Sequence, residues 1–224
     1  MRTPPQGIRS PGSTVAVDAG PEPWPDLREF LETVVAGEVT LPTRTVCCAV
    51  CRSAIWGFAR IDHHRWVRTG LAEAVYGPGK TPDQCAAIVT DLLSSPMSGP
   101  VVLTRADEHQ IDAALARNPR GHVTSSTVVW RAQPQRLGRI VVVSAGTGDL
   151  AVAEECQATL AAYGYHPEVI TDVGVVGLHR LLDVAGQLQD VDVIMVVAGI
   201  EGTLPTAVGG LTAAPIIAVP TSVG

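Results

Sequence analysis

The sequence has few aromatic residues, few charged residues and no long apolar run, and each shortage excludes a class of protein. Aromatic residues make up 4% of the 224 residues, so the core has to be built from the abundant Val, Ala, Leu and Ile. Such small and β-branched residues favour buried parallel strands. Charged residues make up 17% against 46% hydrophobic residues, which favours a well-packed globular chain over a disordered one.

Charge and hydropathy also exclude several partners. The formal net charge is -6 and no block of like charges occurs, which argues against nucleic acid as a ligand. No apolar run approaches the roughly 20 residues of a membrane-spanning helix. The first residues lack the apolar core of an export signal. We therefore expect a cytoplasmic protein with no membrane partner.

The five cysteines are an odd number, which argues for free thiols over disulfide bonds. Cys48 and Cys51 form a single C-x-x-C motif, Cys47 could add a third thiolate, and His63 and His64 lie downstream. A zinc site normally has a second ligand pair at matching spacing. None follows here, so we predict ordinary thiols and no metal site.

The pattern along the chain predicts a leader and two domains. Residues 1–25 are rich in Pro, Gly, Ser and Thr and predict a flexible leader. Residues 26–135 predict a smaller N-terminal α+β domain with helices from Asp26 to Gly37, from Thr81 onward and over 108–116, and strands at 101–104 and 128–130. The stretch 40–68 is the most basic, and its arginines fit a solvated helix face as well as an anion-binding face.

Residues 136–224 alternate regularly between strand and helix patterns. The predicted strands are 140–143, 169–171, 193–197 and 216–219, and the predicted helices are 149–163, 175–189 and a shorter one that ends near Gly209-Gly210. Strands that alternate with helices predict a parallel sheet with right-handed crossovers. The fold class is therefore α/β, with a parallel-sheet domain in the second half that we expect to be flavodoxin-like and three-layered.

Four loops leave the carboxyl ends of these strands, where open parallel sheets bind ligands. They span residues 144–149, 171–180, 198–205 and 220–224, and each is rich in Gly, Ser or Thr. Glycines allow backbone N–H groups to approach a ligand, hydroxyls add donors, and helix N-termini favour anions. The loops together predict a site for a phosphate or carboxylate compound.

Several ionisable side chains in these loops have two interpretations. His179 and Arg180 could be a solvated first helical turn, or a proton carrier beside an anion clamp. Glu201 and Asp149 could be simple helix-start acids, and Asp172 could be only a turn residue. Glu201, Asp149 and Asp172 share one edge with His179, which favours a functional role for these three.

These loops resemble those of the LarB family, which joins a distinctive N-terminal region to a domain similar to aminoimidazole ribonucleotide carboxylase/mutase. The matching segments are SAGTGD at 144–149, DVGVVGLHR at 172–180, AGIEGTLP at 198–205, VGGL at 208–211, AVPTSVG at 218–224, IDHHRWVRTGLAEAVYGPGKTPDQ at 61–84 and LTR at 103–105. Together they cover roughly residues 61–224. Gly148 and Leu71-Ala72-Glu73 depart from the family's pattern.

The resemblance implies a reaction on nicotinic acid adenine dinucleotide. The pyridinium ring is carboxylated at C5 with carbon dioxide or bicarbonate, and the phosphoanhydride is hydrolysed. The products are AMP and pyridinium-3,5-biscarboxylic acid mononucleotide, a precursor of the nickel-pincer cofactor. It also implies a homo-oligomer, and Mg²⁺ is the metal that commonly accompanies pyrophosphate chemistry.

The resemblance also assigns the site residues. Glu201 is expected to handle the C5 proton, with His179 and Asp149 as further catalytic residues. The expected substrate-binding residues are Ser144, Gly146, Asp172, Arg180, Gly199, Thr221 and Ser222, with Lys80 and Arg105 from the N-terminal region.

The family's covalent nucleophile is a cysteine downstream of PTSVG. Since this sequence ends at Gly224, we expect the C-terminal end of the α/β domain to be missing. Two other functions remain open: aminoimidazole ribonucleotide carboxylase/mutase, and a non-catalytic nucleotide-binding or assembly protein.

Overall fold

The computed structural model describes residues 53–63, 65–95 and 98–222, which all belong to one compact unit. The predicted leader, the helix predicted from Asp26 and the cysteines Cys47, Cys48 and Cys51 lie outside these residues. Among the residues described, no helix is both long and apolar enough to cross a bilayer. The predicted domain boundary near residue 136 stays a prediction.

The first half of the described chain is an α+β region around a four-stranded sheet. An antiparallel hairpin of β1 (Ser53–Trp56) and β2 (Ala59–Asp62) is followed by α3 (Arg65–Thr69). The sheet has the order β3-β4-β6-β5, made of β3 (Ala74–Tyr76), β4 (Val101–Thr104), β6 (Thr127–Trp130) and β5 (His122–Thr124). β3 and β4 are parallel, and the other pairs are antiparallel.

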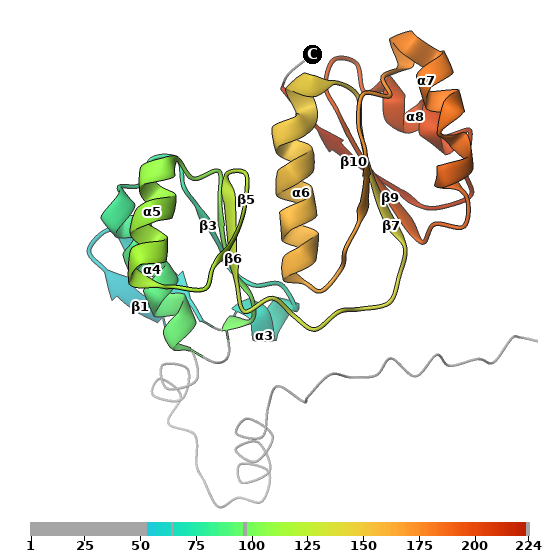
Figure 1. Cartoon of the computed structure of the whole chain (residues 1–224). Helices are drawn as coiled ribbons and strands as arrows, with labels where there is room; N and C mark the ends of the chain where they lie inside the picture. The colour runs from blue at the N-terminus through green and yellow to red at the C-terminus, as the bar shows by residue number, and fades with distance from the viewer. Residues whose placement is uncertain (1–52, 64, 96–97, 223–224) are drawn as a thin grey trace, which may run out of the picture. The chain divides into compact units, whose positions relative to one another are not determined.

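Two helices, α4 (Pro82–Ser94) and α5 (Glu108–Arg117), cover one face of this sheet (Figure 1). Both begin with a capping box, in which Thr81 pairs with Gln84 and Asp107 with Gln110. Each box satisfies two backbone N–H groups that a helix start leaves without partners. The helix starts predicted from Thr81-Pro82-Asp83 and near residue 108 are confirmed.

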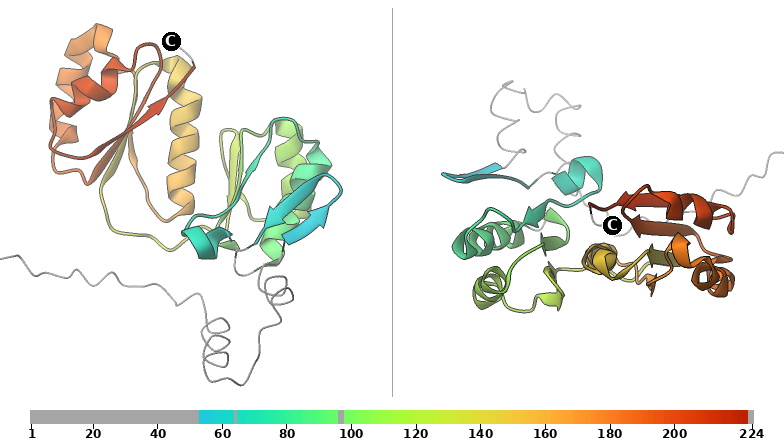
Figure 2. Two further views of the ribbon diagram at one scale, coloured as in Figure 1. Left: turned by 180° about the vertical axis from the view of Figure 1, so that it is seen from behind. Right: turned by 90° about the horizontal axis from the view of Figure 1, so that it is seen from above.

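The second half is a three-layer α/β domain, as the sequence predicts. Its four strands are all parallel, in the order β10-β9-β7-β8: β7 (Ile140–Ser144), β8 (Glu168–Ile170), β9 (Val193–Ala198) and β10 (Ile216–Pro220). Along the chain this order is second, first, third, fourth, which is flavodoxin-like. α6 (Leu150–Ala162) packs on one face, and α7 (Leu178–Asp183) and α8 (Thr203–Gly209) pack on the other (Figures 1 and 2).

Helix α6 is apolar around much of its circumference because it packs on both sheets. Its Ala153 joins Val142 and Val197 of the second sheet, while Ala162 packs against Val102 and Val129 of the first. A helix that is apolar on all sides is normally buried. Consequently, α6 is the element through which the two sheets are joined.

The structure corrects the prediction of one helix over residues 175–189. That segment is a 3-10 turn (Val175–Gly177), the short helix α7 and a second 3-10 turn (Ala185–Leu188). Gly177 and Gly186 lower its helix propensity, and β-branched valines at 175 and 176 lower it further. As a result, His179 is the second residue of α7.

Candidate active site

The four predicted loops meet at the carboxyl edge of the second sheet. The backbone N–H of Ala145 donates to Val197 at 3.2 Å, and that of Val173 donates to Ser144 at 3.2 Å. The N–H of Thr221 donates to Ala198 at 3.0 Å. These bonds tie the segments after β7, β8, β9 and β10 to one another. The predicted convergence of the loops is thus confirmed, and it lies where ligands bind in this topology.

Ser144 is the last residue of β7. The next strand along the chain, β8, lies on one side of β7, and the strands after it, β9 and β10, lie on the other side. The Ser144 side chain is 0% exposed, and its hydroxyl has no hydrogen-bond partner among the described residues. A buried hydroxyl without a partner costs free energy unless a ligand or water satisfies it. Nearby Gly146 has open space, since an added Cβ would meet nothing within 4 Å. The first loop therefore combines a buried hydroxyl that has no partner among the described residues with an open position at Gly146.

Asp149 lies at the start of α6 and is only 6% exposed. Its carboxylate accepts a hydrogen bond of 2.6 Å from the Thr221 hydroxyl. The two residues belong to the first and fourth loops, so this bond links the two. We call the edge formed by the four loops, residues 144–149, 171–180, 198–205 and 220–224, the rim. Ser222 follows as an exposed residue.

The second loop carries an ion pair that the sequence did not predict. Arg180 Nη1 lies 2.6 Å from Asp172 Oδ1, and Asp172 has a left-handed backbone with φ 61°. The guanidinium also folds back over Gly177, where an added Cβ would lie 2.5 Å from Nε. Arg180 is therefore already paired, and an anionic ligand would share it with Asp172. The neighbouring His179 is exposed.

Glu201 lies in the tight turn of the third loop. Gly202 N–H donates to Gly199 at 3.1 Å, and the flanking Ile200 and Gly202 both have left-handed backbones. The Thr203 hydroxyl, and then the backbone N–H of Glu201 itself, hold the pKa of this exposed carboxyl below its usual range. The structure thus presents an ionised, solvent-facing carboxylate, which is the state a general base requires.

Comparison with known proteins agrees with this arrangement. Residues 54–142 match the model for the LarB/PurE-like N-terminal domain, and residues 139–224 match that for AIR carboxylase. The chain is also 31% identical to an uncharacterized protein of Methanocaldococcus jannaschii over 175 residues, which are 73% of this chain and 68% of that protein. The chain belongs to the LarB family. Its two domains support a carboxylase/mutase-type function.

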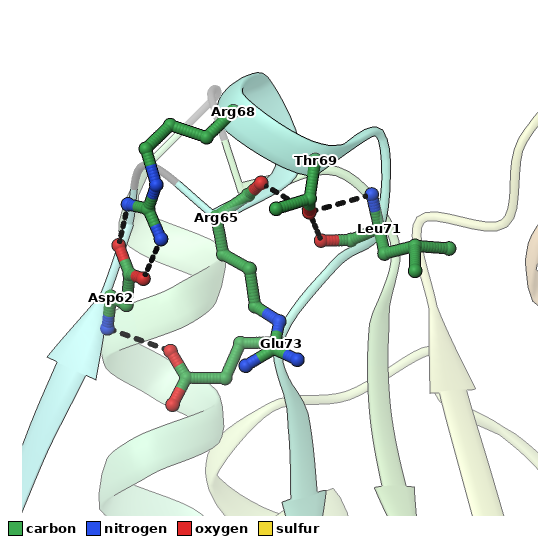
Figure 3. A network of polar contacts seen from close by, with 6 residues as sticks. All are labelled: Asp62, Arg65, Arg68, Thr69, Leu71 and Glu73. Atoms are coloured by element: carbon green, nitrogen blue, oxygen red, sulfur yellow. Dashed lines mark hydrogen bonds and ion pairs between the residues drawn. The ribbon is translucent and has the colours of Figure 1, made fainter.

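The LarB N-terminal signature segment, residues 61–84, builds a structural network in this chain (Figure 3). Arg68 binds the Asp62 carboxylate through two hydrogen bonds of 3.0 and 2.8 Å, and the Asp62 N–H donates to Glu73 at 2.6 Å. Further along, buried His63 contacts Ser98 at 3.3 Å and Asp91 at 2.8 Å. These contacts fix α3 and the end of the hairpin, so Asp62, Arg68 and Glu73 have a structural role here.

The two predicted site residues from the N-terminal region, Lys80 and Arg105, do not belong to the four loops. They follow β3 and β4 of the first sheet. Arg105 reaches α6 through a 2.8 Å contact between its Nε and Glu155 Oε2. Sequence reasoning missed Glu155, because a glutamate in the second turn of an apolar helix carries no local signal of a role.

The described residues contain no group of three or more His, Cys, Asp or Glu side chains placed to hold a metal ion. The acidic residues of the rim are instead separated: Asp149 is bound to Thr221, and Asp172 to Arg180. What the rim offers is a helix start, hydroxyls, the Arg180–Asp172 ion pair and the exposed Glu201 carboxylate. This set suits an anionic organic substrate from which a proton is removed.

Proposed function

We propose that this chain carboxylates the pyridinium ring of nicotinic acid adenine dinucleotide at C5 and hydrolyses its phosphoanhydride. The products are pyridinium-3,5-biscarboxylic acid mononucleotide and AMP, for nickel-pincer cofactor synthesis. The observation that carries the proposal is the convergence of buried Ser144, the start of α6 and ionised Glu201 on one sheet edge. A substrate with carboxylate and phosphate groups matches those partners.

The binding roles follow from placement. Ser144 and the N-terminal turn of α6 would receive an anionic group of the substrate, since backbone N–H groups and a helix start favour negative charge. Gly146 and Gly199 would let the ligand approach the backbone. Thr221, with Ser222 beside it, would hold Asp149 in position at the rim, and Asp172 would orient Arg180.

The chemistry requires removal of one proton. A pyridinium ring attracts electrons, so its C5 becomes nucleophilic only after a nucleophile adds to a neighbouring ring carbon. The resemblance implies that this nucleophile is the thiolate of the cysteine expected downstream of PTSVG. The resulting enamine-like ring attacks carbon dioxide and forms the new C5–carboxyl bond. Glu201 would then take the C5 proton, which lets the added group leave and restores the aromatic ring. His179 could carry the proton onward to solvent, and water completes the phosphoanhydride hydrolysis.

The test is an assay with the dinucleotide and ¹³C-bicarbonate, on a version of the protein that includes the cysteine expected downstream of PTSVG, in which mass spectrometry follows both products. We expect Glu201→Gln to abolish the labelled biscarboxylated product while substrate affinity changes little. Glu108→Gln, which alters an exposed first-turn glutamate on α5, is the matched control. An unchanged rate of product formation by Glu201→Gln would overturn the assignment.

The match of residues 139–224 to AIR carboxylase supports a second candidate, carboxylation of aminoimidazole ribonucleotide. Turnover of that compound without turnover of the dinucleotide would favour it. A third outcome, substrate binding without release of AMP, would favour a non-catalytic nucleotide-binding protein.

We also propose that the chain is a homo-oligomer. Val176 is 98% and Ile200 79% exposed, and Leu178 and Leu182 add further apolar surface on the same loops and helix. Exposed apolar patches commonly mark protein interfaces. Analytical ultracentrifugation of the full chain tests this, and a monomer at micromolar concentration would contradict it.

A further inference from the structure

A second set of strand ends lies outside the rim described above. β3 and β4 are parallel neighbours; β3 ends at Tyr76, and the loops after the two strands carry Lys80 and Arg105. The Tyr76 side chain is large, aromatic and 48% exposed. Lys80 Nζ donates to the backbone oxygen of Tyr76 at 2.8 Å, so the ammonium is held at the backbone of that residue. The end of β3 and the two loops thus present one exposed aromatic ring and two cations.

These loops are locked into place. An added Cβ at Gly77 would lie 2.8 Å from Ala106 Cα and from the Arg105 carbonyl oxygen, so the two loops pack with no room to spare. The buried Gln110 side chain donates to the backbone oxygens of Gly77 and Lys80 at 3.0 and 2.7 Å. Such fixed loops lose little freedom on binding, which favours a preorganised binding site.

The same loops are attached to helix α6. Thr104 Oγ1 donates to Glu155 Oε1 at 2.5 Å, and Arg105 Nε donates to Glu155 Oε2 at 2.8 Å. The carboxylate and the Tyr76 hydroxyl raise the pKa of Arg105. Glu155 lies six residues after Asp149 on the helix side, which is about 9 Å along the axis. Arg105 and the rim are therefore attached to the same helix.

Resting on the proposed function, we propose that Tyr76, Lys80 and Arg105 form a subsite for the adenylate half of the dinucleotide. The adenine base stacks on Tyr76, and the phosphate binds Lys80 and the Arg105 guanidinium. The element order also fits: Gly79-Lys80-Thr81 follows a parallel strand and begins a helix, as in phosphate-binding loops. The full motif of such loops is G-x-x-x-x-G-K-[ST]. Ala74 stands at the position of the first glycine, so this chain has only the G-K-[ST] half of the motif.

Lys80 allows a direct test because it is the only lysine in the sequence. Reductive methylation with ¹³C-formaldehyde, which keeps the charge, gives one lysine signal besides the N-terminal amine. We expect AMP to shift this signal in the full chain, and nicotinic acid mononucleotide to leave it unchanged. An unshifted signal at saturating AMP would overturn the subsite.

Variants give a second readout by calorimetric titration. Tyr76→Leu and Lys80→Ala should each weaken AMP binding about tenfold or more, with the affinity for nicotinic acid mononucleotide unchanged. Arg117→Ala, an exposed arginine at the far end of α5, is the control and should match the parent. Thermal melts show whether each variant is folded.

The outcomes separate this inference from the proposed function. If AMP binds through Lys80 but no carboxylated product forms, the subsite stands and the proposed reaction fails. If the product forms while both variants bind AMP as the parent does, the reaction stands and Arg105 serves only to attach β4 to α6.

Discussion

The Thr221 hydroxyl donates a 2.6 Å hydrogen bond to the Asp149 carboxylate, across 72 residues of sequence. Thr221 follows β10, the edge strand of the second sheet, and Asp149 precedes α6. The bond therefore holds the outermost loop of the rim against the first one. Because Asp149 is buried, this contact affects stability as well as the shape of the site.

Replacing Thr221 by Val should destabilise the fold by about 1.5–3 kcal/mol, since it removes a hydrogen bond to a buried charged group. Urea denaturation measures the loss. In a double-mutant cycle with Asp149→Asn, the two costs should not add. Additive costs would show that the two side chains do not interact in solution.

Gly164 should be among the least replaceable residues of the chain. Its φ is 87°, and an added Cβ would lie 2.1 Å from the Pro134 carbonyl oxygen. The Gly164 oxygen also accepts from Arg136 N–H at 2.8 Å, which anchors the connection between the two sheets. We expect Gly164→Ala to cost at least about 2 kcal/mol in the free energy of unfolding.

Gly186 provides the control for that substitution. It is exposed, and an added Cβ there would meet nothing within 4 Å. Gly186→Ala should change stability by no more than about 0.5 kcal/mol. Equal effects of the two alanines would contradict the close approach at Gly164.

Strong local signals made much of the fold predictable. Thr81-Pro82-Asp83 predicted the start of α4, because capping and a first-turn proline act within a few residues. The four strands of the second sheet were found from their apolar runs, and their alternation with helices predicted parallel pairing. Once the strands are parallel, their following loops must share an edge, so the convergence of the site loops followed.

Other features depend on tertiary contacts that leave no local pattern. β3 and β5 have three residues each, too few for a periodic signal, and they gain stability only from their neighbours in the sheet. The pairing of Arg180 with Asp172 depends on the left-handed turn at Asp172, which sequence reasoning did not anticipate. Lys80 and Arg105 were assigned to the substrate from the N-terminal region, but no local pattern showed that they contact Tyr76 and Glu155.

Cys156 should be an unreactive thiol. Burial, and then the nearby Glu155 charge, raise its pKa to about 11, and its sulfur lies 3.4 Å from that of Met195. At pH 8 only about one thiol in a thousand would be ionised, and the thiolate is the reactive form. Peptide mapping after brief iodoacetamide treatment should find Cys156 unmodified in the native chain and modified in urea. Equal labelling in both conditions would contradict this.

We expect Thr203 to determine the pH below which the rate of the carboxylation reaction falls. Its hydroxyl is the main cause of the lowered pKa of Glu201, and a general base must be deprotonated to act. The rate should therefore fall as the pH drops through the pKa of Glu201. Thr203→Val removes the hydroxyl and raises the pKa of Glu201. The fall of the rate toward acidic pH should therefore begin at a higher pH than in the parent. Thr206→Val on the same helix leaves Glu201 untouched and is the control. A pH–rate profile of kcat would show the displacement, and superimposable profiles for Thr203→Val and the parent would remove Glu201 from the role of base.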